Sequence, residues 1–81
     1  MTVHIQIVSP KGTLYEGDLQ YAVFPGRAGE FAVYPAHAPL ISILAKGAVK
    51  CVAGEGKVEI IAVGSGFVEV KENKITVCVE Q

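Results

Sequence analysis

The sequence predicts an all-β fold: a two-sheet antiparallel β-sandwich of about eight to ten short strands with no helical domain. Three observations support this prediction. Apolar residues alternate with period two almost throughout the 81 residues, turn residues bound each alternating run, and no segment has a helical period. Short strands with frequent turns are typical of two packed sheets. We expect a single domain over residues 1–81, because half this length would bury too little apolar surface to fold.

Alternating segments mark the strands in order along the chain. In the first and last of them, apolar residues occupy every second position and so share one face of the strand. The expected strands are 3–7, Thr13 to Phe24, Glu30 to Val33, Leu40 to Leu44, Ala48 to Val52, Lys57 to Val63, Gly66 to Lys71 and 75–79.

Turn residues separate these strands. Gly54-Glu55-Gly56 and Glu72-Asn73 are predicted hairpin turns, because glycine and asparagine tolerate positive φ. Gly17 interrupts the long second strand, and Gly64-Ser65-Gly66 precedes the seventh. At both places we expect the strand to bend or to pass from one sheet to the other.

The composition favours an interaction protein. The hydrophobic share is 51% and the charged share 19%, so some apolar surface should remain exposed for a partner. Seven basic and eight acidic residues give a net charge of −1, which argues against nucleic acid as a partner. No run of about 18 apolar residues predicts a membrane span, and the first residues do not resemble a signal peptide.

The residues that could support catalysis do not form a recognisable motif, so we expect no enzyme activity, no cofactor and no metal. His4, His37, Cys51 and Cys78 are too far apart in the sequence for the paired spacings of zinc sites, although folding could bring them together. Both cysteines are interpreted as buried free thiols. Ser65 lies between two glycines but precedes a strand, whereas a nucleophile elbow leads into a helix.

The stretch from Phe24 to Leu40 contains three prolines and two glycines around one short apolar strand. So many restricted and permissive backbone positions indicate rigid, shaped loops of the kind that suit docking. His37 lies between Pro35 and Pro39 and allows two interpretations. It either ties this loop to neighbouring backbone or contacts a partner chain, because the hydrogen bonds of a histidine serve both roles.

Five ordered blocks of the sequence form one pattern. The longest is Gly26-x-x-Gly29-Glu30-Phe31-x-Val33-Tyr34-Pro35-x-His37-x-Pro39-Leu40, and the chain opens with Ile5-Gln6-Ile7-Val8-Ser9-Pro10 and Leu14-Tyr15-Glu16-Gly17. Later blocks are Lys46-Gly47, Gly64-Ser65-Gly66-Phe67-Val68-Glu69-Val70 and Asn73-Lys74-Ile75-Thr76-Val77. In order and spacing these blocks resemble the epsilon subunit of F-type ATP synthase, and the opening block is similar to the family's first two strands. The resemblance covers essentially the whole chain and implies the amino-terminal β-sandwich domain of that subunit.

The sequence departs from the family pattern in three ways. Ala32 replaces a usual glycine, and Ser65 interrupts what is commonly a glycine pair. The chain also ends at Gln81, whereas typical members continue into two carboxy-terminal helices. The resemblance therefore implies a short form without the helical domain and without its inhibition of ATP hydrolysis.

The resemblance also implies a role and partners. The domain would belong to the central stalk of a bacterial enzyme, on the cytoplasmic face of the inner membrane, and would couple ion-driven ring rotation to ATP synthesis in other subunits. The implied c-ring contacts are Arg27, Gly29, Glu30 and Phe31. The implied gamma-subunit contacts are Val8, Ser9, Pro10, His37, Ala38, Pro39, Leu40 and Ile41. The residues alone also allow a stand-alone sandwich that binds peptide or sugar, although a chain without tryptophan offers little stacking surface for a sugar.

Overall fold

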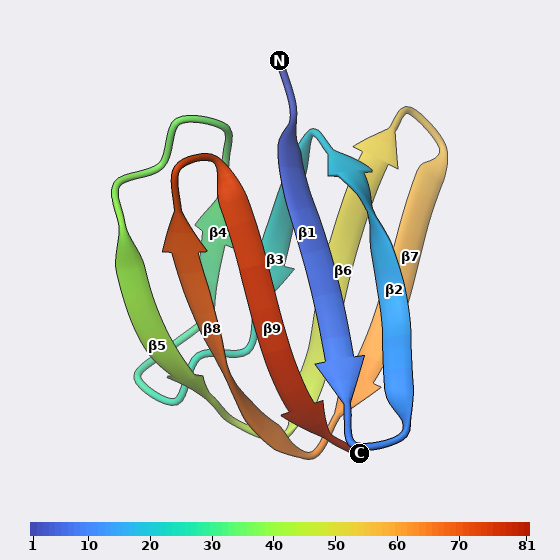
Figure 1. Cartoon of the computed structure of the whole chain (residues 1–81), viewed down its shortest axis with the longest axis vertical. Helices are drawn as coiled ribbons and strands as arrows, with labels where there is room; N and C mark the ends of the chain where they lie inside the picture. Colours follow the sequence, from blue (N-terminus) through green and yellow to red (C-terminus); the bar gives the residue numbers. More distant parts are fainter.

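The computed structural model describes residues 1–81 and contains nine strands and no helix (Figure 1). The strands are β1 (Val3–Ser9), β2 (Gly12–Leu19), β3 (Tyr21–Phe24), β4 (Phe31–Val33), β5 (Leu40–Leu44), β6 (Gly47–Gly54), β7 (Lys57–Val63), β8 (Ser65–Lys71) and β9 (Lys74–Glu80). No helix is available that could cross a membrane.

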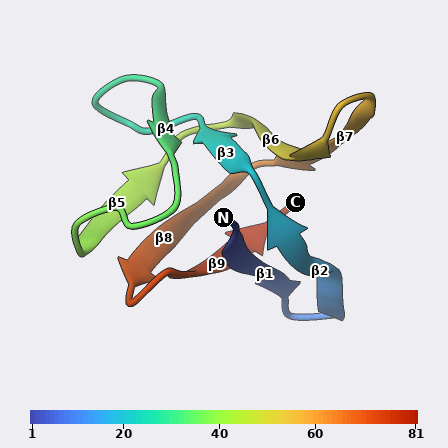
Figure 2. The ribbon, with the colours of Figure 1, turned by 90° about the horizontal axis from the view of Figure 1, so that it is seen from above.

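The strands form two sheets that pack face to face (Figure 2). The five-stranded sheet has the order β2-β1-β9-β8-β5, and the four-stranded sheet has the order β4-β3-β6-β7. The predicted two-sheet sandwich is confirmed. One pair departs from the antiparallel rule: β1 and β9 run parallel, with His4 opposite Lys74 and Val8 opposite Cys78.

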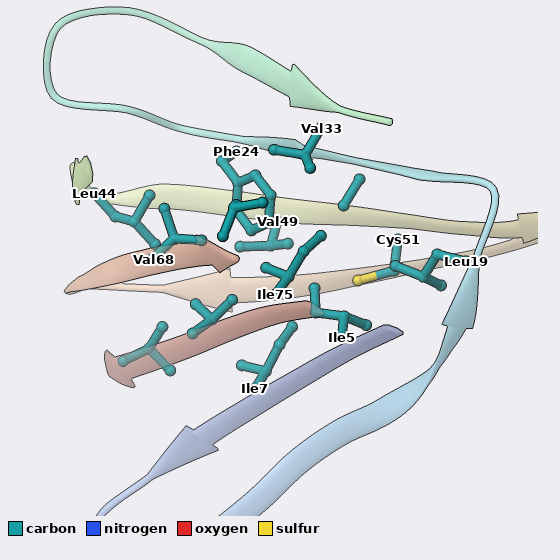
Figure 3. Packing of buried hydrophobic residues seen from close by; sticks show 14 of the residues in the cluster. Ile5, Ile7, Leu19, Phe24, Val33, Leu44, Val49, Cys51, Val68 and Ile75 are labelled. Atoms are coloured by element: carbon teal, nitrogen blue, oxygen red, sulfur yellow. The ribbon is translucent and has the colours of Figure 1, made fainter. Parts of the chain in front are cut away.

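The core lies between the sheets and is built by the alternation seen in the sequence. Sixteen buried hydrophobic residues form one cluster, and Phe24, Ile5 and Ile75 are completely shielded from water (Figure 3). Successive residues of a strand point to opposite faces, so β1, β8 and β9 contribute every second side chain to this cluster, and each other strand contributes at least one. The nine strands thus share one core.

The prediction of one long second strand from Thr13 to Phe24 is wrong, because the structure has two strands there, β2 and β3. Gly17 lies inside β2, paired with Ile5, and the break falls at Gln20. The chain leaves the five-stranded sheet after Leu19, and the Gln20 N–H donates to the Val52 carbonyl at 2.7 Å in the other sheet. The sheet change therefore needs no glycine. The fourth strand begins at Phe31, one residue later than predicted, which is within the usual spread of strand ends.

The other turn predictions are confirmed. Glu72 and Asn73 adopt φ values of 51° and 62° in the turn between β8 and β9, and Gly56 adopts 72° between β6 and β7. The segment 64–66 carries the chain from β7 in one sheet to β8 in the other. Residues that tolerate positive φ thus mark both hairpins.

Candidate functional site

The loop between β3 and β4, residues 25–30, is anchored to the opposite sheet. The Arg27 N–H donates to the Ile43 carbonyl at 2.9 Å, and the Ala45 N–H donates to the Pro25 carbonyl at 2.7 Å. Gly26 also forms an antiparallel bridge with Leu44. The loop is therefore joined by backbone bonds to β5 and its end, although its flanking strands belong to the other sheet.

Two glycines shape this loop for different reasons. A Cβ at Gly26 would lie 2.5 Å from the Gly29 carbonyl oxygen and 2.9 Å from the Phe31 ring, so the turn leaves no room for a side chain. Gly29 has open space but adopts a φ of 136°, which L-residues rarely take. The Gly29 N–H closes the turn on the Gly26 carbonyl at 3.0 Å.

The four residues of the predicted c-ring contact divide into a tip and a base. Arg27, Gly29 and Glu30 are exposed at the tip. Phe31 lies at the base, where its ring stacks on the buried Phe24 with centroids 5.5 Å apart. Phe31 therefore supports the loop from below, and the exposed tip presents one positive and one negative side chain.

A second anchored loop, residues 34–39, lies at the opposite end of the sandwich, beside the turn between β8 and β9 (Figure 1). The Ala36 N–H donates to Asn73 Oδ1 at 3.0 Å, and Asn73 Nδ2 donates to the Thr2 carbonyl at 2.6 Å. His37 Nδ1 donates to the Ala38 carbonyl at 2.7 Å. His37 thus ties its own loop, as the first of its two interpretations proposed, and contact with a partner stays a prediction.

The residues of the predicted gamma contact do not lie together. The first group, Val8, Ser9 and Pro10, lies where β1 turns into β2. The second group lies at the opposite end of the sheet, in the loop before β5 and the start of that strand; it comprises His37, Ala38, Pro39, Leu40 and Ile41.

An apolar row connects these two groups across the outer face of the five-stranded sheet. Strand register places Ile43 opposite Phe67, Phe67 opposite Cys78, and Cys78 beside Val8. Ile43 is 53% exposed and Phe67 is 48% exposed, and Ile41, two residues before Ile43 on the same face, is 74% exposed. We call Ile41, Ile43, Phe67, Cys78 and Val8 the apolar row.

One end of the apolar row is hollowed into a shallow groove of about 400 Å³. Phe67 and Cys78 line it together with the whole of the Val8–Pro10 segment. The register of β1 against β2 shifts between Ile7 and Val8, which marks a β-bulge beside the groove. The groove therefore offers an apolar recess for a partner side chain.

Sequence reasoning missed Ile43, Phe67 and Cys78. Strand parity could have found them. Val68 and Val70 alternate into the core, so Phe67 must point outward, and Ile43 has the opposite parity to the buried Leu44. Large apolar side chains at outward positions are the signal for a docking face.

The titratable groups form no reactive cluster, and no three His, Cys, Asp or Glu side chains are grouped to hold a metal ion. His4 lies on the outer face between two carboxylates, with Nδ1 2.9 Å from Asp18 and Nε2 3.1 Å from Glu16. The hydrogen bond to Asp18, and then that to Glu16, raises the pKa of His4. This arrangement can hold a proton on an exposed ring.

The two cysteines differ in their surroundings, and both are free. Burial, and to a smaller extent the charge of Glu59, raises the pKa of the Cys51 thiol to about 11. The prediction that both thiols are buried is wrong for Cys78, which is half-buried. Its neighbours Val77 and Val79 point into the core, so Cys78 faces outward.

The fold and these surfaces define a class of protein: a β-sandwich interaction domain with an anchored loop at one end and an apolar face beside it. Residues 2–81 match the family described as the ATP synthase delta/epsilon chain β-sandwich domain. The chain belongs to this family. The prediction of an epsilon-type amino-terminal sandwich is therefore confirmed.

Curated relatives agree with this family. The chain is 42% identical over 79 residues to the ATP synthase epsilon chain of Nitratiruptor sp. and 39% identical over 79 residues to that of Campylobacter fetus subsp. fetus. Each match covers 98% of this chain and 61% of the relative. The chain thus spans about three fifths of the length of these relatives.

Solved structures share the fold at low sequence identity. A chain in the mitochondrial ATP synthase of Euglena gracilis superposes with a TM-score of 0.90 at 15% identity, covering 99% of this chain and 51% of that one. A chain in the central stalk and c-ring structure of the Tetrahymena thermophila mitochondrial enzyme has a TM-score of 0.80 at 12% identity, covering 96% and 63%. These likenesses support the two-sheet sandwich.

Proposed function

We propose that this chain is a rotor-coupling subunit of a bacterial ATP synthase, docked between the gamma subunit and the polar loops of the c-ring. One observation carries the proposal: the exposed loop tip and the apolar row are joined through β5. Arg27 in the loop donates to the carbonyl of Ile43, a member of the row, at 2.9 Å. A force on the loop would pass by this backbone bond into the strand that holds the gamma-facing surface.

The gamma subunit is the proposed partner of the apolar row and of the loop that contains His37. Three members of the apolar row, Ile41, Ile43 and Phe67, would bury their exposed apolar area on docking. Such burial is the main favourable contribution to protein association. The groove beside Val8 and Cys78 would receive an apolar side chain of gamma. The Ser9 and Pro10 contacts belong to the same edge of this surface.

The c-ring loops are the proposed partner of the loop tip at Arg27, Gly29 and Glu30. Charged side chains at an exposed contact contribute only about 0–1 kcal/mol per pair, so their use is to set register between ring and stalk. Phe31 would hold the tip in shape through its contact with Phe24. Gly26 and Gly29 allow the tight turn, and the backbone bonds of Gly29 to Gly26 and of Arg27 to Ile43 hold the tip in one position.

The sandwich suits a mechanical role because its strands and close-packed core resist deformation. Catalysis would reside in other subunits of the assembly. The domain would be peripheral to the membrane, on the cytoplasmic face, and held there through the complex.

Co-purification of the tagged chain with the gamma subunit of the same genome tests this proposal. Wild type should bind, and Ile41→Asp should bind weakly, because Ile41 is 74% exposed and a carboxylate there would be buried without a partner. Glu55→Ala, in the exposed turn between β6 and β7, is the control and should bind as wild type does. Failure of the folded wild-type chain to bind gamma would favour a stand-alone binding module.

A further inference from the structure

The outer face of the four-stranded sheet is a second apolar surface, on the side of the sandwich away from the apolar row (Figure 2). Register places Tyr21 opposite Val52 and Val52 opposite Val58 in one row across it. The next row contains Ala32, Val23, Lys50 and Ile60. We call these two rows, with Tyr34, the tyrosine face.

The tyrosine face is unusually apolar for the outside of a sandwich. An antiparallel sheet that covers a core on one side normally presents polar residues on the other. Here Val58 is 46% exposed, Ile60 is 59% exposed and Tyr34 is 55% exposed. Tyr34 also stacks on Tyr21 with centroids 4.9 Å apart, which fixes two aromatic side chains of the type that dominates binding hot spots.

Lys50 is the only charged residue among the members of this face. Its cross-strand neighbours are Val23 on one side and Ile60 on the other, so the cation rises from apolar surroundings on a central strand. The ion pairs in the chain join His4 to Glu16 and to Asp18, and Lys50 forms none. A surface that covers Lys50 must supply an anion, because burying an unpaired charge is costly.

This charge decides between possible occupants. A second copy docked about a two-fold axis through the centre of the tyrosine face would bring two Lys50 side chains together, and like charges oppose such a contact. A partner with an apolar contact surface and one central carboxylate would cover Val58 and Ile60 and would also pair with Lys50.

We propose that the tyrosine face is a docking surface for such a partner, a protein surface that is apolar and carries one Asp or Glu opposite Lys50. The assignment rests on the proposed function, because it places the partner among the neighbouring subunits of the same assembly. The tyrosine face and the apolar row lie on opposite sides of the sandwich, so both can be occupied at once.

Carbodiimide coupling in the purified assembly tests the proposal, because this reagent joins an amine directly to a carboxylate that it touches. Mass spectrometry should find Lys50 joined to an Asp or Glu of another subunit. Lys50→Arg keeps the cation and removes the amine, so it should enter the assembly normally and lose the cross-link. Lys50→Glu should weaken binding at this surface at least about 30-fold, and Lys57→Glu, at the start of β7, should not.

Acetylation of Lys50 gives a second readout. The amine should react at least about tenfold more slowly in the assembly than in the isolated chain. A chain that enters the assembly with Lys50 unprotected and not cross-linked would overturn the proposal while leaving the proposed function intact. A chain that does not enter would overturn both. Self-association of the isolated chain that Ile60→Asp abolishes would assign this face to a second copy and overturn the partner proposed.

Discussion

Phe67→Ala tests whether the apolar row holds the gamma subunit. Phe67 is 48% exposed in the free chain. An aromatic side chain buries about 150–250 Å² when fully covered, so docking would remove about 70–120 Å² of Phe67 from water. At about 25 cal/mol per Å² this contributes about 2–3 kcal/mol to binding. Since about 1.4 kcal/mol changes an equilibrium tenfold, the Kd for gamma should rise about 30- to 140-fold.

Titration calorimetry of the purified chain with gamma would measure this Kd. Thermal denaturation of each variant by circular dichroism must show that it is folded at the titration temperature, because half of the Phe67 side chain is already buried and also supports the fold. Glu55→Ala, on the exposed turn between β6 and β7, should leave the Kd unchanged.

A folded Phe67→Ala protein that binds gamma as tightly as wild type would refute this reasoning. The gamma contact would then lie away from the row, and the exposed aromatic ring of Phe67 would need another partner. A weaker complex for Glu55→Ala as well would show that the assay reports a general loss of fold.

Three further predictions concern the chain by itself. The hydrogen bond to Asp18 raises the pKa of His4 in the folded protein. The stability that His4 contributes is therefore fully present below its unfolded pKa of about 6.5 and is lost as pH rises through its folded pKa. The difference in Tm between wild type and His4→Gln should therefore be small and shrink between about pH 5.5 and pH 8.5; a difference that grows would contradict this. Burial raises the pKa of Cys51 to about 11, so a thiol reagent at neutral pH should modify Cys78 first and reach Cys51 only after unfolding; equal rates would count against the packing described. Gly29→Ala should lower the free energy of unfolding in urea by about 1–3 kcal/mol, because alanine is strained at a φ of 136°, and unchanged stability would show that the loop relaxes freely.

Strands with regular alternation and clear turn residues at their ends were predictable from the sequence. Leu40–Leu44 and Lys57–Val63 have the bounds that the sequence indicates, and the turn at Glu72 and Asn73 lies where its residues place it. The break at Gln20 was not predictable, since it depends on a backbone bond to Val52 in the other sheet and has no turn residue to mark it. The site was less predictable. The prolines and glycines indicated a shaped loop between Phe24 and Leu40, and its contact with the c-ring, which only the resemblance implies, stays a prediction. The Val8 and His37 segments were grouped although they lie at opposite ends of one sheet.

The sequence by itself determined the two-sheet class, most turns and the family to which the chain belongs. The sheet class and the turns depend on residues close together in the chain, because alternation sets which side chains share a face and local φ preferences set the turns. The family follows from a pattern that extends over residues 2–81. Only the tertiary structure decided that β1 lies parallel to β9, that Phe67 lies two strands from Val8, and that Arg27 bonds to Ile43. Strand order and register depend on packing between distant segments, which sequence alternation leaves open.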